Sequence, residues 1–315
     1  MVQRYPLRLF DVSVRRRIVL SPSMLRFVFA GDALTHARSF GPDQRIKIFF
    51  PNAAGELTVP RGEDWYGQYR NQSEVSRAPM RTYTIRALRN DEAEMDVDFA
   101  AHGDGGPASR WATRAQPGDR VVMLAPHAEE DGGGGGVEWK PPQDVREVLL
   151  IADETALPAV AGILESLSEQ AQPPKVRAYI EVPVGADAID LVGPDDMQIV
   201  WLPRAAHAFG ESVDYGQRLI EAIRAARLLP HEARGGEAAG NGEERGDTNA
   251  QLSEIDVDRE ILWEQAAATA SSFYAWIAGE AGAVMAIRRH LVGERGFAKS
   301  AISFMGYWRK GRVFE

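Results

Sequence analysis

Two short stretches near opposite ends of the chain combine aromatic and basic side chains. One is Arg81-Thr-Tyr-Thr84, and the other, Ser303 to Arg312, contains Tyr307, Trp308 and Arg309. An arginine can neutralise a phosphate, and a tyrosine can stack on a flat ring while its hydroxyl forms a hydrogen bond. Such residues suit a planar, anionic cofactor, such as a flavin that passes electrons to an anionic partner.

A second candidate ligand site is the run His102-Gly-Asp-Gly-Gly-Pro-Ala-Ser-Arg-Trp-Ala112. Pro107 can open a short helix at its favoured first position, with Ser109 in the first turn. The free N–H groups of a helix start make a ready site for pyrophosphate. Without further context, a turn that binds no ligand is an equally good interpretation, just as Arg81 and Tyr83 fit a surface arginine and a core tyrosine.

The first half of the chain contains Arg81-Thr-Tyr-Thr84 and the run from His102 to Ala112, and strands must position both. Short β-rich runs, several of them alternating and separated by turn signals, predict a small antiparallel barrel of six strands within residues 1–140. The expected strands are 8–20, 24–29, 45–50, 81–86, 94–101 and 120–124.

The second half, residues 141–315, alternates strands with helices and predicts a parallel sheet covered on both faces. Thr155 is the expected N-cap of the first helix. The βα turns after residues 152 and 278 lie where ligands bind such sheets, although neither contains a GxGxxG motif. The expected strands are 148–152, 176–182, 198–202, 273–278 and 301–304, and the expected helices are 156–170, 215–229 and 281–292.

Two segments have the composition of loops. Residues 129–137 contain five consecutive glycines with no helix after them, which favours a flexible connector over a phosphate loop. Residues 231–255 are acidic and glycine-rich, so we expect a disordered insert that precedes the last strands and the aromatic–basic tail.

The net charge and the cysteine content of the chain exclude several classes of function. The net charge of −9 argues against nonspecific nucleic-acid binding, and the absence of cysteine excludes disulfides and cysteine-ligated iron–sulfur clusters within this chain. We expect no protein metal site, so a bound organic cofactor would carry any redox chemistry. The N-terminus lacks the apolar core of a signal peptide, and no apolar run is long enough to span a bilayer, which predicts a cytoplasmic protein.

Taken in order along the chain, these motifs resemble the siderophore-interacting proteins, flavin-dependent ferric-siderophore reductases of the ferredoxin–NADP reductase superfamily. The resemblance covers nearly the whole chain. It rests on the Lys47 strand, Arg81-Thr-Tyr-Thr84, Asp98-Phe-Ala-Ala-His102 running into Gly106 to Ala112, Pro117-Gly-Asp119, Asp153 to Pro158, Ala278-Gly-Glu280 and Gly306-Tyr-Trp-Arg309.

The resemblance implies an N-terminal barrel that holds FAD and a C-terminal domain that receives NADH or NADPH. No side chain is expected to act as an acid, base or nucleophile, because the flavin transfers the electrons. The implied FAD-binding residues are Arg81, Tyr83, Thr84, Asp98, Phe99, Ala100, Ala101, His102, Pro107, Ala108 and Ser109. The implied NAD(P)H-binding residues are Asp153, Glu154, Thr155, Gly279 and Glu280.

The resemblance also implies a basic cluster that holds an anionic ferric chelate. Lys47 and Arg309 match two of its members, whereas the third position, usually an arginine, is His127 here and is only partly charged at neutral pH. Reduction releases iron because siderophores hold Fe(III) far more tightly than Fe(II). We expect a monomer that binds neither nucleic acid nor a membrane stably.

Three alternatives stay open. The protein could reduce a free flavin or another acceptor, or an external ferredoxin could supply its electrons. It could also be a siderophore carrier without catalytic activity, although the flavin motifs argue against this.

Overall fold

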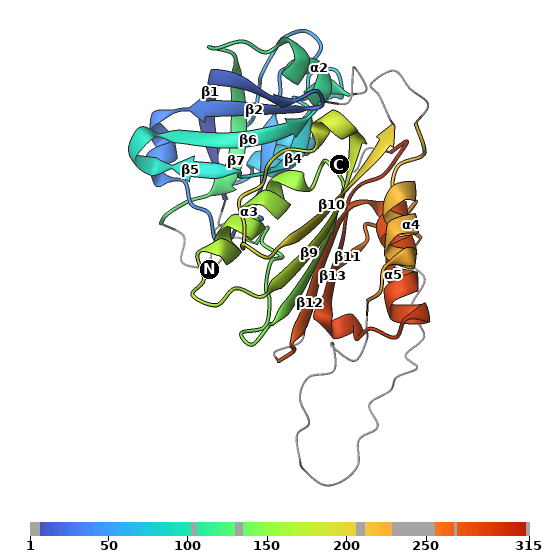
Figure 1. The fold of residues 1–315 in the computed structure, drawn as a ribbon. Helices are drawn as coiled ribbons and strands as arrows, with labels where there is room; N and C mark the ends of the chain where they lie inside the picture. The colour runs from blue at the N-terminus through green and yellow to red at the C-terminus, as the bar shows by residue number, and fades with distance from the viewer. Residues whose placement is uncertain are drawn as a thin grey trace. The chain divides into compact units, whose positions relative to one another are not determined.

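A computed structural model of the protein describes residues 7–101, 106–129, 135–205, 212–228, 256–267 and 270–312 (Figure 1). The described residues up to Trp139, together with Pro158–Ile163, form one compact unit. The described residues of Lys140–Leu157 and those from Leu164 onward form a second. His102, the acidic insert and most of the glycine-rich connector lie outside the described residues.

The N-terminal unit is built on one antiparallel sheet with the strand order β4-β3-β7-β1-β2-β6-β5. Its strands are β1 (Leu7–Ser21), β2 (Met24–Ala30), β3 (Arg45–Phe49), β4 (Met80–Thr84), β5 (Ala87–Arg89), β6 (Glu94–Ala100) and β7 (Arg120–Pro126). Its helical segments are η1 (Asp32–His36), α1 (Trp65–Arg70), η2 (Asn90–Glu92) and α2 (Pro107–Arg114).

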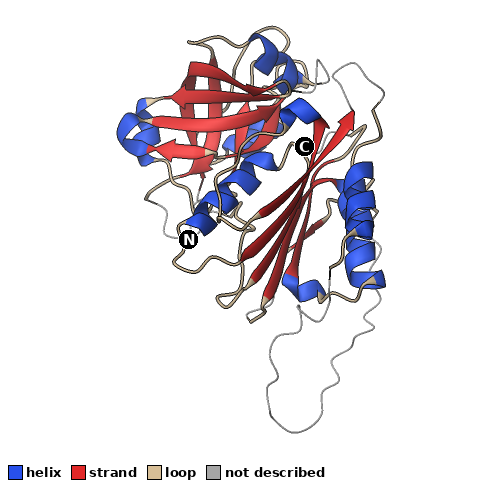
Figure 2. Ribbon diagram, in the orientation of Figure 1, coloured by secondary structure: helices blue, strands red, loops and turns tan. Residues whose placement is uncertain are grey.

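The edges of this sheet meet because of its connectivity. β4 and β5 are the two edge strands, yet only Ile85 and Arg86 separate them in the chain. Three Cα–Cα steps span at most about 11 Å, so the sheet curls on itself, as Figure 2 shows. The predicted antiparallel barrel is confirmed in this form. The sequence prediction missed β5 as a seventh strand, because three residues are too few to show an alternating pattern.

Alternation along β6 separates a core face from a charged face. Met95, Val97 and Phe99 lie in the main hydrophobic core, with Phe27, Phe29 and Phe50 among their neighbours. The residues between them are acidic and pair with arginines across the strands, as Arg89 does with Asp96 and Arg26 with Asp98. A smaller core on the other side of β3 joins Phe49 to Tyr69 of α1.

The C-terminal unit carries a six-stranded sheet in the order β10-β9-β8-β12-β13-β11, parallel except for the edge strand β11. Helices α4 and α5 pack on one of its faces (Figure 1). Its strands are β8 (Glu147–Ala152), β9 (Lys175–Val184), β10 (Gln198–Ala205), β11 (Trp263–Glu264), β12 (Phe273–Glu280) and β13 (Ile302–Trp308). Its helical segments are η3 (Gly185–Asp187), α4 (Gln217–Ala225), α5 (Ala281–Arg288), the π-helical turn Arg289–Glu294 and η6 (Lys299–Ala301). Helix α3 (Leu157–Ser168) is divided, because Pro158–Ile163 belong to the N-terminal unit and its other residues to this one.

The predicted alternation of strands and helices is confirmed, with two local corrections. β13 extends to Trp308, so Tyr307 and Trp308 belong to a strand and not to a tail. Thr155 is not the N-cap of α3, because its hydroxyl donates to Asp153 and Ala156 precedes the helix. Among the described helices, none has the length and apolarity needed to cross a lipid bilayer.

Candidate functional site

The β3–β4 pair carries positive charge that is only partly neutralised. Lys47 lies opposite Thr82 and donates from Nζ to its hydroxyl at 2.7 Å. Burial, helped by the charges of Arg45 and Arg81, holds the pKa of Lys47 below its usual value. Arg45 pairs with Glu138 at 2.8 Å. Within the described part of the chain, no carboxylate pairs with Lys47 or Arg81, so their charges are uncompensated although the protein is net acidic.

Tyr83 lies between Arg81 and Thr84 in the chain, and its ring packs against other aromatic rings. Its ring is half-buried and lies 4.1 Å from the ring of Phe99, centroid to centroid. Trp111 of α2 packs against Phe99 and Phe50 from the same core. Burial raises the pKa of the Tyr83 hydroxyl, so this group stays protonated and can donate a hydrogen bond. The next residue, Thr84, is buried.

The end of β6 leads toward the start of α2. The Asp98 carboxylate is held by Arg26 through two hydrogen bonds of 2.7 and 2.8 Å, and Phe99 is buried in the core. Ala100 and Ala101 are half-buried, and His102 lies outside the described residues.

Helix α2 begins at Pro107, as predicted, after Gly106, which provides no side-chain cap. A Cβ atom at Gly106 would meet no atom of the described residues within 4 Å. The N–H groups of Ala108 and Ser109 lie in the first turn, where they lack acceptors within the helix. The geometry therefore suits an anion, because the positive end of the helix dipole faces it.

His127 follows β7 and forms a bridge with Ala37. Its ring lies between Phe10 and His36, at centroid distances of 6.1 and 5.6 Å. Its Nδ1 accepts a hydrogen bond from the Glu129 N–H at 3.2 Å. The Glu129 carboxylate lies 3.9 Å from the same nitrogen.

Asp153 connects three strand ends in the C-terminal unit. Its Oδ1 accepts from the N–H and hydroxyl of Thr155, and its Oδ2 accepts from the Glu280 N–H and Trp308 Nε1, both at 2.8 Å. Burial, helped by the charge of Glu154, raises the pKa of Asp153 to about 7. Gly279 has a φ of 153°, and a Cβ there would lie 2.7 Å from Asp153 Oδ2. Asp153 thus ties β8, β12 and β13 together at their carboxyl ends.

A buried ion cluster includes Glu154, the residue that follows Asp153. The Arg204 guanidinium donates to Glu154 and to Glu181, and all three side chains are at most 4% exposed. Glu181 also accepts from the Gly216 N–H at the start of α4, and the ring of Tyr215 lies 4.3 Å from the guanidinium. Arg204 is therefore bound to two buried acids, which gives no support to a contact with the 2′-phosphate of NADPH.

Unlike Lys47, Arg309 forms ion pairs with carboxylates. Its Nη1 donates to Glu280 at 2.7 Å and its Nε to Asp258 at 2.8 Å. Lys310 likewise pairs with Asp214. The sequence analysis did not identify Asp258 or the Asp153–Trp308 bond, because nothing in the local pattern around Asp258 or Asp153 indicates a partner so far along the chain.

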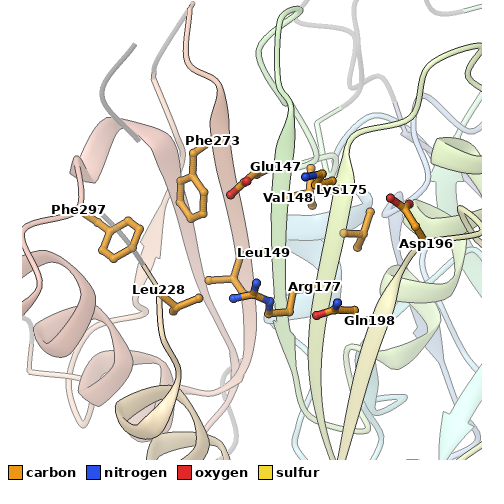
Figure 3. A pocket seen from close by; sticks show the side chains of 11 residues that line it. Glu147, Val148, Leu149, Lys175, Arg177, Asp196, Gln198, Leu228, Phe273 and Phe297 are labelled. Carbon is orange, nitrogen blue, oxygen red and sulfur yellow. The ribbon is translucent and has the colours of Figure 1, made fainter. Parts of the chain in front are cut away.

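A pocket of about 260 Å³ lies at the amino ends of the strands in the C-terminal sheet, where β8, β9, β10 and β12 begin (Figure 3). Phe273 and Phe297 line it together with both basic and acidic side chains, including Arg177 and Asp196. Ligands of parallel sheets bind at the carboxyl ends of the strands, so we assign this pocket no part in the site.

The two units match two consecutive family models. Residues 13–130 match the siderophore-interacting FAD-binding domain, and residues 145–311 match the siderophore-interacting protein.

Known proteins resemble this chain over most of its length. The ferric vibriobactin reductase ViuB of Vibrio cholerae is 30% identical over 100% of this chain and 93% of its own length. The NADPH-dependent ferric-chelate reductase of Escherichia coli is 33% identical over 63% of this chain and 75% of its own length. A solved siderophore utilization protein from T. fusca has a TM-score of 0.70 at 27% identity and covers 99% of this chain and 97% of its own.

Proposed function

Since this chain belongs to the siderophore-interacting protein family, we propose that it is a ferric-siderophore reductase. One NADH or NADPH gives up a hydride, two ferric chelates each receive one electron, and one proton is released. Bound FAD supplies the conversion between two-electron and one-electron transfer. Fe(II) is held weakly by the siderophore and becomes available for iron assimilation.

The observation that carries this proposal is the uncompensated charge of Lys47 and Arg81. Placing cations side by side without acidic partners costs electrostatic energy, and such a cost is usual where a ligand supplies the missing charge. The chain has nine more acidic than basic residues, 45 against 36, so acidic partners are not scarce. An anionic ligand at β3 and β4 accounts for this arrangement.

Residues of the N-terminal unit would hold FAD. Arg81 would neutralise a phosphate, the Tyr83 ring would stack on the isoalloxazine, and Thr84 would contribute a hydroxyl. The start of α2, from Pro107 to Ser109, would bind the pyrophosphate. Because Arg26 occupies the Asp98 carboxylate, the segment from Asp98 to His102 would contribute mainly backbone groups.

The carboxyl ends of β8 and β12 would receive the nicotinamide nucleotide. Asp153, Thr155, Gly279 and Glu280 form this edge of the sheet, where ligands of such folds bind. Glu154 would act indirectly, because its carboxylate is fully buried against Arg204. Lys47, His127 and Arg309 would attract the ferric chelate by charge, without transferring a proton.

We place the reaction in the cytoplasm, where NADH and NADPH are available, and expect the protein to act as a monomer. Cell fractionation and light scattering of the purified protein test these two statements.

The decisive experiment combines a spectrum with an activity assay. The purified protein should show flavin absorption bands that bleach anaerobically with NADPH or NADH. Addition of a ferric siderophore and a ferrous trap should then restore the bands and colour the trap. If the protein binds FAD yet reduces no ferric chelate, the proposal is refuted. If it takes up no FAD, the remaining hypothesis is a siderophore carrier without catalytic activity.

A lysine variant links this activity to the site. Lys47→Met keeps most of the aliphatic stem and removes the charge, so KM for an anionic ferric chelate should rise about tenfold. Lys175→Met, at an exposed lysine at the start of β9, is the matched control and should leave KM unchanged. Loss of bound flavin in Lys47→Met would show that the lysine serves the cofactor and not the chelate.

A further inference from the structure

Two carboxylates of different character hold the Arg309 guanidinium. Glu280 is 5% exposed, and its Oε2 also accepts from the Ala283 N–H, which caps α5. Its Oε1 accepts from Arg309 Nη1 and from the Lys310 N–H. The Asp258 side chain is 54% exposed and accepts from Arg309 Nε. Among the described residues, Arg309 is the sole hydrogen-bond partner of the Asp258 carboxylate.

Gly282 makes room for this arrangement. A Cβ atom at Gly282 would lie 2.7 Å from Arg309 Nη1 and 2.9 Å from Glu280 Oε2. The guanidinium therefore lies against the first turn of α5, where an ordinary side chain would displace it. The Asp258 hydrogen bond, followed by that of Glu280, raises the pKa of Arg309, so the guanidinium stays charged at any physiological pH.

The two acids therefore differ in how readily a ligand can replace them. Glu280 is tied to the helix start and is buried, so it stays in place. Asp258 is exposed, and within the described ranges its carboxylate has no second hydrogen-bonding role. An anion that approaches Arg309 must compete with Asp258, and water and salt weaken this exposed pair.

We propose that Asp258 is a specificity-determining residue that reduces the preference of the site for highly charged chelates. This rests on the proposed function, in which Arg309 attracts the ferric chelate. Asp258 offsets the charge of Arg309, so the lost attraction grows with the negative charge of the ligand. A neutral chelate loses nothing, and the protein therefore accepts chelates over a wider range of charge than the free arginine would favour.

The test measures binding of gallium chelates, because Ga(III) resembles Fe(III) in size and charge but is not reduced by a flavin. Calorimetry gives Kd for a trianionic gallium tris-catecholate and a neutral gallium tris-hydroxamate with the FAD-loaded protein. Asp258→Asn should lower Kd for the trianion about two- to fivefold, the range of exposed ion pairs, and leave the neutral chelate unchanged. Glu260→Gln, an exposed acid two residues away, is the control for general charge effects.

Two further variants test whether Asp258 acts through Arg309. In an Arg309→Ala background, Asp258→Asn should change Kd less than it does in wild type, because Asp258 then no longer competes for the guanidinium and only its direct repulsion of the trianion remains. Gly282→Ala keeps every charge and favours the helix, yet it displaces the guanidinium and should raise Kd for the trianion. The inference is overturned if Asp258→Asn changes Kd for the trianion no more than Glu260→Gln does, or changes Kd for both chelates equally. It is also overturned if Asp258→Asn keeps its full effect on Kd in the Arg309→Ala background. Because gallium binding needs no turnover, a failure to reduce iron would count against the proposed function alone.

Discussion

Replacing Asp153 by asparagine is expected to change how stability depends on pH. Asp153 is 2% exposed, and its carboxylate accepts hydrogen bonds from Thr155, Glu280 and Trp308. Burial, followed by the charge of Glu154, raises its pKa to about 7, although the hydrogen bonds oppose this rise. Asparagine has nearly the same shape but does not titrate, so a comparison of the two proteins isolates the ionisation of this one group.

The direction of the pH dependence follows from whether Asp153 is protonated in the folded and in the unfolded protein. Between pH 4 and 7 the unfolded chain has lost the Asp153 proton, whereas the folded protein keeps it. The stability from this group is therefore fully present below about pH 4 and is lost as pH rises through 7. Each pH unit in this range costs about 1.4 kcal/mol. From pH 5 to 7, wild type should lose about 2 kcal/mol relative to Asp153→Asn, because the folded protein itself begins to release the proton as pH nears 7.

Urea unfolding of both FAD-loaded proteins at pH 5, 6, 7 and 8 measures this difference. The indole N–H signal of Trp308 gives a direct second readout, because that group donates to Asp153 Oδ2. The signal should shift with a midpoint near pH 7 in wild type and stay constant in Asp153→Asn, and Trp308→Phe assigns it. Parallel stability profiles and a constant indole signal would refute the reasoning and show that the hydrogen bonds keep Asp153 ionised throughout.

Three further variants test separate parts of the site. Arg81→Ala should weaken FAD binding at least tenfold, measured by flavin absorbance after dialysis, because an unpaired guanidinium beside a phosphate contributes strongly; unchanged retention would remove Arg81 from the flavin site. His127→Arg should lower KM for a trianionic chelate about two- to fivefold, because arginine always carries a charge, and an equal effect on a neutral chelate would argue against charge as the cause. Arg204→Met should reduce the free energy of unfolding by about 3–5 kcal/mol, because it leaves Glu154 and Glu181 buried without a cation; thermal unfolding close to wild type would contradict this.

Local patterns predicted the elements that carry the site. The β-rich run 94–101 predicted a strand, and the structure forms one there, with Val97 and Phe99 in the core. The continuous apolar run 148–152 indicated a strand covered on both faces, and its residues are fully buried. Pro107 marked the first residue of α2, since its fixed φ and missing N–H suit that position.

The pairing of charges could not be predicted in the same way. Asp258 and Arg309 are 51 residues apart, Glu154 and Arg204 are 50 apart, and Asp153 and Trp308 are 155 apart. Each pair depends on the order of strands in the sheet, to which a residue's own neighbours in sequence give no clue. For this reason the sequence did not identify the partners of Arg204, which the fold makes the centre of a buried ion cluster.

The two basic residues expected to attract the chelate therefore contribute differently. Arg309 is held by acids and stays charged, so its attraction for an anion is permanent but reduced by Glu280 and Asp258. Lys47 is held by a hydroxyl, and its burial, helped by the charges of Arg45 and Arg81, lowers its pKa. An incoming anion should stabilise the charged lysine and offset this cost, so we expect the energy gained on binding to be larger at Lys47. The ranking of the two sites follows from their partners, since both side chains carry the same formal charge.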